Sequence, residues 1–311
     1  MIIDRLKVPP FNTTLMGVVR GVADYYGYEY SDAMLYGATS HAFLINIHEV
    51  LCPSGPYCWR PERFDKLLGN LGMARTDLGF YSRETPAAQR QAIEATLRRS
   101  LDDGAPCALL NMENQLITGY DDSGFLTTQP WAPHADFPPG HLTWGTWEEL
   151  GDELHMSFYR FERATPSEPR QTVAAGLDTA TDMWRSPTRY TEAPYGVGPQ
   201  AYETWISAVE AGHGGEHGNW WNGTVWAECR ARAADFAREI GQTWLELHDQ
   251  AEDLATRYET ISACLTRASD KEMPAAEKRE LLRETRTLEA ETIDPLTSLV
   301  EALGLPAPGV A

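Results

Sequence analysis

Apolar positions in the first half of the chain predict several helices followed by a set of strands. Between residues 13 and 26, apolar side chains recur every three or four positions, which is the period of a helix, and Gly27 marks its end. Similar spacing predicts helices over residues 61–71 and 86–103, and a short second helix within residues 31–43. The first part of the chain is therefore predicted to be mainly helical.

Strand signals replace the helical period after residue 106. Short apolar and β-branched runs cover residues 107–111, 115–119 and 125–128, and the turn residues at 121–124 separate the last two runs as in a hairpin. A further strand is predicted over residues 157–162, where side chains alternate in character. Helices followed by antiparallel strands are typical of an α+β fold.

The second half of the chain has a different pattern. Residues 164–200 are rich in Pro, Thr and Ser and are interpreted as a connection over the surface. Helical periodicity dominates from residue 201 onward, with Pro295 expected to kink or split the last helix. The predicted organisation is an α+β domain (1–165), a linker (166–200) and a helical domain (201–311).

Composition narrows the range of partners. The chain has 311 residues, is 42% apolar and contains ten Trp and thirteen Tyr, which indicates a folded globular protein. Its 26 basic and 45 acidic residues give a net charge of −19, which disfavours nucleic acid and membrane surfaces as partners. No secretory signal or long apolar span is visible, and the five cysteines are expected to be reduced thiols in the cytoplasm.

The hairpin carries the most specific chemical pattern. It begins at Glu113, continues through Gly119-Tyr-Asp121, and reaches Gln129-Pro-Trp131 after a turn. This pattern resembles the hairpin of papain-like cysteine peptidases of the bacteriocin-leader type, in which a histidine stands six residues before Gly-Tyr-Asp and an aspartate precedes the proline. In this sequence Glu113 occupies the histidine position and Gln129 the aspartate position.

The first helix resembles the nucleophile helix of the same superfamily. The segment from Val8 to Val19, with the later Tyr-Tyr-Gly27, is more similar still to the N-terminal domain of butirosin biosynthesis protein H, a papain-like acyltransferase relative. That resemblance implies a cysteine at the helix start, where the helix N-terminus stabilises a thiolate. Here the position holds Thr14, or Asn12 if the register slips, and the glutamine of the oxyanion hole has no counterpart.

The substitutions disfavour papain-type cleavage. A glutamate cannot activate a threonine hydroxyl as histidine activates a thiol, because their acidities are too far apart, and Gln129 has no imidazole to orient. Two interpretations of Glu113 remain open. It is either a solvated strand residue beside a decayed pocket, or part of a retained cleft where, with Asn12, it binds a polar ligand or acts as general base on water.

His41 is a further candidate from the same resemblance. Residues 36–43 look like the "GHAF" stretch of butirosin-H-like proteins, which implies a position near the cleft. Taken alone, a histidine in an apolar run is more often a core residue. The nearby His48, Cys52 and Cys58 match no standard zinc spacing.

A second motif points to different chemistry. His213, Glu216 and His217 fit the H-x-x-E-H pattern of zinc hydrolases, which needs both histidines on one helical face. Glycines at four neighbouring positions disfavour a helix, so the match is interpreted as chance.

The predicted fold is therefore α+β and papain-like with an antiparallel sheet, followed by an α-helical domain. The predicted function is that of a pseudoenzyme in natural-product biosynthesis, which lacks the Cys–His–Asp triad and binds or processes a small metabolite, a peptide or a carrier-protein-borne acyl group. One alternative is an acyltransferase or amide hydrolase that uses Glu113, Thr14 or His41 in a rearranged site, and a second is a zinc hydrolase at the His213, Glu216 and His217 motif. No cofactor or metal is predicted, and the helical domain is equally compatible with a homodimer surface.

Overall fold

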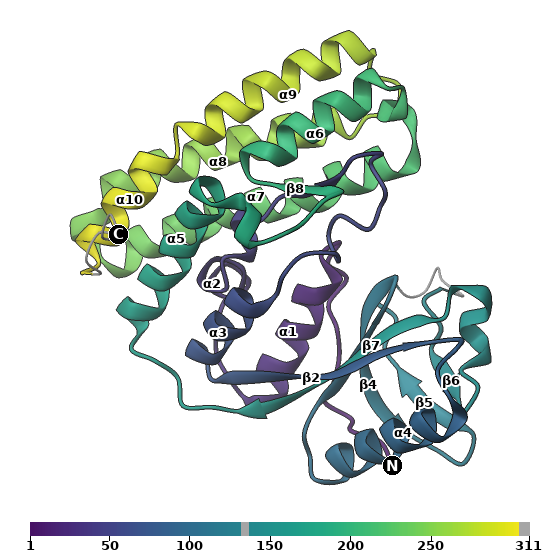
Figure 1. Cartoon of the computed structure of the whole chain (residues 1–311). Helices are drawn as coiled ribbons and strands as arrows, with labels where there is room; N and C mark the ends of the chain where they lie inside the picture. Colours follow the sequence, from purple (N-terminus) through teal and green to yellow (C-terminus); the bar gives the residue numbers. More distant parts are fainter. Residues whose placement is uncertain (132–136, 305–311) are drawn as a thin grey trace. The chain divides into compact units, whose positions relative to one another are not determined.

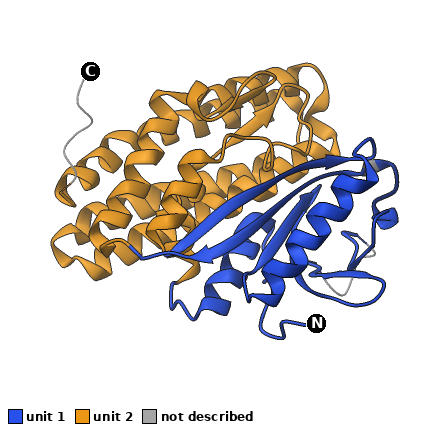
Figure 2. Ribbon diagram, turned by 60° about the horizontal axis from the view of Figure 1, so that its bottom comes forward, with its two compact units in different colours: residues 1–30, 72–166 blue, residues 31–71, 167–311 orange. Residues whose placement is uncertain are grey.

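The computed structural model describes residues 1–131 and 137–304. They divide into two compact units, each assembled from two separate stretches of chain (Figure 2). Unit 1 contains Met1–Tyr30 and Gly72–Pro166, and unit 2 contains Ser31–Leu71 and the residues from Ser167 onward. Antiparallel sheets with helices in the N-terminal half precede a largely helical C-terminal region (Figure 1), so the α+β class is confirmed.

Unit 1 is built around a six-stranded antiparallel sheet. The strands are β2 (Met73–Ser82), β3 (Cys107–Asn111), β4 (Glu113–Tyr120), β5 (Gly124–Thr127), β6 (His141–Thr143) and β7 (His155–Arg163). Their order across the sheet is β2-β7-β3-β4-β5-β6. The predicted hairpin is thus confirmed as β4 and β5, which pair from Tyr120 with Phe125 to Ile117 with Thr127.

Two helices pack on this sheet, and they contact strand residues that point to opposite faces. Helix α4 (Ala87–Asp102) places Leu97 and Leu101 in a core with Leu109 and Ile117 of the sheet. Helix α1 (Thr14–Tyr26) approaches Leu116, the neighbour of Ile117, and a side chain at its Gly21 would overlap Leu116 as well as the carbonyl oxygen of Lys7. Because successive strand residues point to opposite faces, α1 and α4 lie on opposite faces of the sheet.

Unit 2 is mostly helical. Its helices are α2 (Asp32–Ala38), α3 (Glu62–Asn70), α5 (Pro169–Arg185), α6 (Pro199–Glu210), α7 (His217–Thr243), α8 (His248–Ala268), α9 (Ala275–Ala290) and α10 (Ile293–Ala302). Two short strands, β1 (Asn46–His48) and β8 (Tyr195–Val197), form an antiparallel pair. No helix in the described part of the chain is long and apolar enough to cross a membrane.

A buried polar network lies in the core of unit 2. Arg230 of α7 forms an ion pair with Glu289 of α9, and the Tyr202 hydroxyl donates a hydrogen bond to the same carboxylate. The Arg230 guanidinium also donates to the carbonyl oxygens of Ala42 and Leu44, both at 2.8 Å. These bonds fix the backbone within and directly after the 3-10 turn η1 (His41–Phe43) to helix α7.

Several secondary-structure predictions are corrected by the structure. The stretch interpreted as a surface connection contains helix α5, which buries Val173, Leu177 and Met183. The strand β2 was not predicted. The last predicted helix is split, but the break falls before residue 293 and places Pro295 in the first turn of α10, where proline is tolerated.

The compact units also differ from the predicted division of the chain. Residues 31–71, assigned from the sequence to the α+β domain, group with the C-terminal helices. A direct contact shows why: Gly37 of α2 lies so close to the Phe236 ring of α7 that a side chain at Gly37 would overlap it. Long-range contacts of this kind leave no periodic signal in the sequence.

Candidate functional site

Thr14 and Glu113 form the centre of the candidate site in unit 1. Thr14 is the first residue of α1 and Glu113 is the first residue of β4. The Thr14 hydroxyl donates a 2.8 Å hydrogen bond to Oε2 of Glu113. The structure therefore brings together the two residues that occupy the nucleophile and base positions in the predicted resemblance.

Two neighbouring residues extend the hydrogen-bond network. The backbone N–H of Asn114 donates to the Thr14 hydroxyl oxygen at 3.0 Å, and the Asn114 side chain lies 3.4 Å from the same oxygen. The Tyr159 hydroxyl of β7 donates to Oδ1 of Asn114 at 2.5 Å. The Thr14 hydroxyl is thus engaged both as donor and as acceptor.

The network is closed to solvent. Thr14 is 1% exposed, Asn114 is 2% exposed and Glu113 is 6% exposed. The interpretation of Glu113 as a solvated strand residue is therefore wrong. The retained alternative, in which Glu113 acts on a ligand or on water, would require an opening that exposes this buried carboxylate.

The position of the pair suggests an electrostatic role. The unpaired N–H groups at a helix start carry a partial positive charge, and an anion beside them is stabilised. The carboxyl group of Glu113, on β4, lies at this end of α1 through its hydrogen bond with the first helical residue. The Thr14 hydroxyl already donates to Oε2 of this carboxyl group, which suits structural support better than proton abstraction.

Asn12 and Gln129 are two further residues that the sequence predicted for this site. Asn12 is partly buried and precedes α1 by two residues. Gln129 is partly buried, and its amide donates a 3.0 Å hydrogen bond to the carbonyl of Pro138. With no imidazole at position 113, Gln129 has no base to orient, and its observed bond is made to backbone.

Asn114 and Tyr159 of the network were not predicted, and neither was the buried Gln115 that follows Asn114 in β4. The Gln115 amide is 1% exposed and donates to the carbonyl oxygens of Thr128 and Pro139, at 2.6 and 2.8 Å. A signal was present in the sequence, because three successive polar residues begin a strand that is otherwise apolar. Buried polar side chains need partners, and these residues find them in each other and in the adjacent backbone.

His41 belongs to unit 2, whereas Thr14 and Glu113 belong to unit 1. It is 1% exposed, and within the described part of the chain neither ring nitrogen has a hydrogen-bond partner. Burial, and secondarily the charge of Arg230, lower the pKa of His41 to about 3, so its ring is neutral at physiological pH. A neutral imidazole that is this deeply buried cannot serve as an acid, but it can still donate one hydrogen bond and accept another.

The H-x-x-E-H motif has no zinc-site geometry. His213 lies in the 3-10 turn η4 (His213–Gly215), whereas His217 is the first residue of α7. The Nδ1 atom of His213 lies 3.1 Å from the Glu216 carboxylate, and the His217 ring lies against Trp220. Among residues 1–131 and 137–304, no group of three or more His, Cys, Asp or Glu side chains is arranged to hold a metal ion.

None of the five cysteines stands at the start of α1. All five are free thiols, and Cys107, the one in the sheet of unit 1, is fully buried. Burial raises the pKa of the Cys107 thiol to about 12, so it stays protonated and unreactive. Thiolate chemistry is therefore unsupported at this site.

Comparison with known proteins adds no family. No protein-family model and no curated protein matches the sequence.

Proposed function

We propose that the chain is a papain-like protein in which the nucleophile–base pair has become a buried structural hydrogen bond, and that it binds its ligand without cleaving it. The 2.8 Å bond from Thr14 to Glu113 carries this proposal. The ligand class suggested by the resemblance is a small metabolite, a peptide or a carrier-borne acyl group.

The placement of the two residues supports the papain-like part of the proposal. In the resembling families a helix start and the first residue of a hairpin meet to form the catalytic pair. Here the first residue of α1 meets the first residue of β4, and α1 packs against that strand. Two residues separated by 99 positions come into contact at the expected places, while both residue types have changed.

The bonding of Thr14 supports the non-catalytic part. A nucleophilic hydroxyl must give its proton to a base and direct a lone pair at a substrate. The Thr14 oxygen accepts from Asn114 and donates to Glu113, and it is almost fully buried. A substrate would have to displace these bonds before it could react.

Acyl-enzyme formation is the sharpest test. Purified protein would be incubated with p-nitrophenyl esters and with acyl-N-acetylcysteamine thioesters, which imitate carrier-borne acyl groups. We expect no acyl group on Thr14 by mass spectrometry and no turnover that depends on Thr14 or Glu113, while a bound thioester raises the thermal midpoint and stays intact.

Matched variants make the result decisive. Thr14→Val and Glu113→Gln remove the candidate nucleophile and base, and Thr118→Val changes another threonine in β4 whose hydroxyl donates to the carbonyl of Leu126. Ester turnover that is lost in the first two variants but kept in the third would contradict the proposal and establish the acyltransferase or hydrolase alternative.

A further inference from the structure

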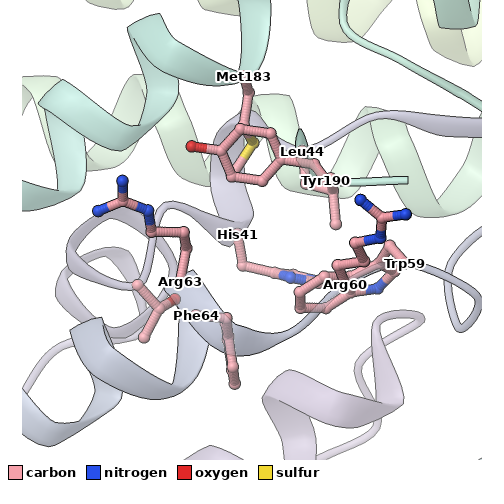
Figure 3. A pocket seen from close by; sticks show the side chains of 9 residues that line it. His41, Leu44, Trp59, Arg60, Arg63, Phe64, Met183 and Tyr190 are labelled. Carbon is pink, nitrogen blue, oxygen red and sulfur yellow. The ribbon is translucent and has the colours of Figure 1, made fainter. Parts of the chain in front are cut away.

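A pocket in unit 2 surrounds His41, separately from the Thr14–Glu113 pair. It contains about 210 Å³ of empty space, a value that includes its open mouth. Aromatic and apolar side chains form most of its wall, and Arg60 and Arg63 line it as well. In the view of Figure 3, the two arginines lie on opposite sides of His41.

His41 is the polar group that this pocket leaves unmatched. Both ring nitrogens are buried without a hydrogen-bond partner in the described residues, and a buried polar group without a partner is costly. A neutral imidazole offers one donor and one acceptor, and a hydroxyl group can satisfy either. The enclosed part of the pocket has room for a group of the size of one water molecule, which a hydroxyl matches.

The His41 ring is held in place by its neighbours. The rings of Trp59 and Phe64 lie against it, with centroids 5.5 and 5.8 Å away, and Tyr36 presents an edge contact at 6.3 Å. The bonds from Arg230 to the carbonyls of residues 42 and 44 fix the backbone that follows His41. These contacts therefore hold the imidazole in place in the wall of the pocket, although its two nitrogens have no hydrogen-bond partner in the described residues.

Charge at the pocket favours an anion. The chain carries a net charge of −19, yet two arginines line this pocket. Arg60 is partly neutralised by Glu192 at 3.0 Å, in an exposed pair that is weak in water. Arg63 is exposed and has no hydrogen bond or ion pair in the described residues, although it has a longer-range electrostatic interaction with Asp178. A guanidinium group presents a planar fork that matches a carboxylate.

We propose that this pocket binds a small carboxylate with a flat apolar body and a terminal hydroxyl. The hydroxyl reaches His41, the body lies at the mouth of the pocket against the partly exposed Trp59, and the carboxylate pairs with Arg63 at the rim. This site goes beyond the function proposed for unit 1 and stands on different residues.

Three probes separate the contributions of the two polar ends. 4-Hydroxybenzoate has both groups, benzoate lacks the hydroxyl, and 4-hydroxybenzamide lacks the charge. Calorimetric titration of the full chain is expected to show that 4-hydroxybenzoate binds about tenfold more tightly than either of the other two probes.

Variants assign each preference to a residue. His41→Phe is expected to remove the preference for 4-hydroxybenzoate over benzoate, and Arg63→Ala the preference for 4-hydroxybenzoate over 4-hydroxybenzamide. Arg283→Ala makes the same charge change on α9, where the arginine pairs with Glu280, and is expected to change neither preference. Because each preference is a ratio measured on one variant, partial loss of folded protein does not affect it. His41→Gln provides a second variant that keeps polarity at this position.

Three results would overturn the proposal. The first is the absence of saturable binding of 4-hydroxybenzoate at millimolar concentration. The second is binding with preferences that survive both His41→Phe and Arg63→Ala. The third is a crystal structure grown with the probe in which only a water molecule contacts the His41 nitrogens.

Discussion

At the scale of single residues, the Thr14–Glu113 contact lies at a helix start, a position that can support either catalysis or structure. A helix start favours a negative charge, and the resembling families place a thiolate there. In this chain the carboxyl group of Glu113 lies at the helix start, and the helix contributes the Thr14 hydroxyl that donates a hydrogen bond to it. Under the proposed function, this bond stands where the resembling families have a reactive pair, and it ties α1 to β4.

Removing the Thr14 hydroxyl should therefore reduce stability. Thr14→Val keeps the side-chain shape but leaves the Glu113 carboxylate and the Asn114 N–H without this buried partner, and we expect a loss of about 1–3 kcal/mol in the free energy of unfolding. Urea denaturation measures it. Thr118→Val is the control, since its hydroxyl is only partly buried. Equal losses in both variants would show that the contact has no special weight.

His41 should make the stability of the protein depend on pH. Its pKa is about 3 in the folded protein and 6.5 when unperturbed, so as pH falls below 6.5 the unfolded chain binds a proton that the folded chain does not. Folding is therefore weakened between those values. Between about pH 7.5 and about pH 5, we expect His41 alone to remove about 2 kcal/mol of stability.

The difference between two proteins isolates this effect. The free energy of unfolding would be measured across that range for the natural sequence and for His41→Gln, since other titrating groups contribute equally to both. We expect the natural protein to lose more stability on acidification. Parallel pH profiles would mean that the His41 ring takes up protons as readily in the fold as in the unfolded chain.

At the scale of elements, periodic segments were predictable and mixed segments were not. Helices α1, α3 and α4 and strands β3, β4 and β5 follow clear apolar periods. Helix α5 was missed because threonines and prolines usually indicate loops, but here the Thr179 hydroxyl bonds to the carbonyl one turn earlier, which satisfies it inside the helix. Strand β2 was missed because its polar and partly exposed residues pair with β7 alone, at the edge of the sheet.

Sequence spacing predicted two residues of the candidate site, and the rest of the site was not predicted. Counting from Gly27 and Gly119 indicated Thr14 and Glu113, and the structure brings these residues into contact. The bond from Tyr159 to Asn114 and the pocket around His41 depend on residues far apart in sequence, such as Met183 and Tyr190 beside His41. Such contacts leave no periodic pattern in the sequence.

Glycine positions in helices give a test at the same scale. A side chain at Gly218 of α7 would lie 1.7 Å from the carbonyl oxygen of Leu51, whereas one at Gly69 of α3 meets nothing within 4 Å. Gly218→Ala is expected to destabilise the protein by about 1–3 kcal/mol, because backbone must move. Gly69→Ala is expected to stabilise it by up to about 1 kcal/mol. Thermal unfolding compares them, and a tolerated Gly218→Ala would refute the close approach of α7 to this loop.

At the scale of the whole molecule, the chain crosses between the two compact units and returns. It leaves unit 1 after Tyr30 and re-enters it at Gly72. Within unit 1 the two crossing points are tied together, because the carbonyl of Gly72 accepts hydrogen bonds from the Tyr28 hydroxyl at 3.0 Å and from the Ala164 N–H at 2.8 Å. Unit 1 is therefore closed without the inserted segment.

This closure predicts how the protein can be divided. A chain that joins Tyr30 to Gly72 by a short Gly-Ser linker and ends at Pro166 should fold cooperatively and give dispersed amide signals in NMR spectra. A fragment of residues 1–165, which follows the boundary predicted from sequence, keeps residues 31–71 but removes α7 and the Phe236 ring that α2 contacts. Its exposed apolar surface should bind the dye ANS. The opposite result would be a 1–165 fragment that binds no dye and a joined chain that stays unfolded. It would show that residues 31–71 are needed for the sheet to fold, because the Tyr28 and Ala164 bonds to Gly72 would then be too weak to close unit 1 alone.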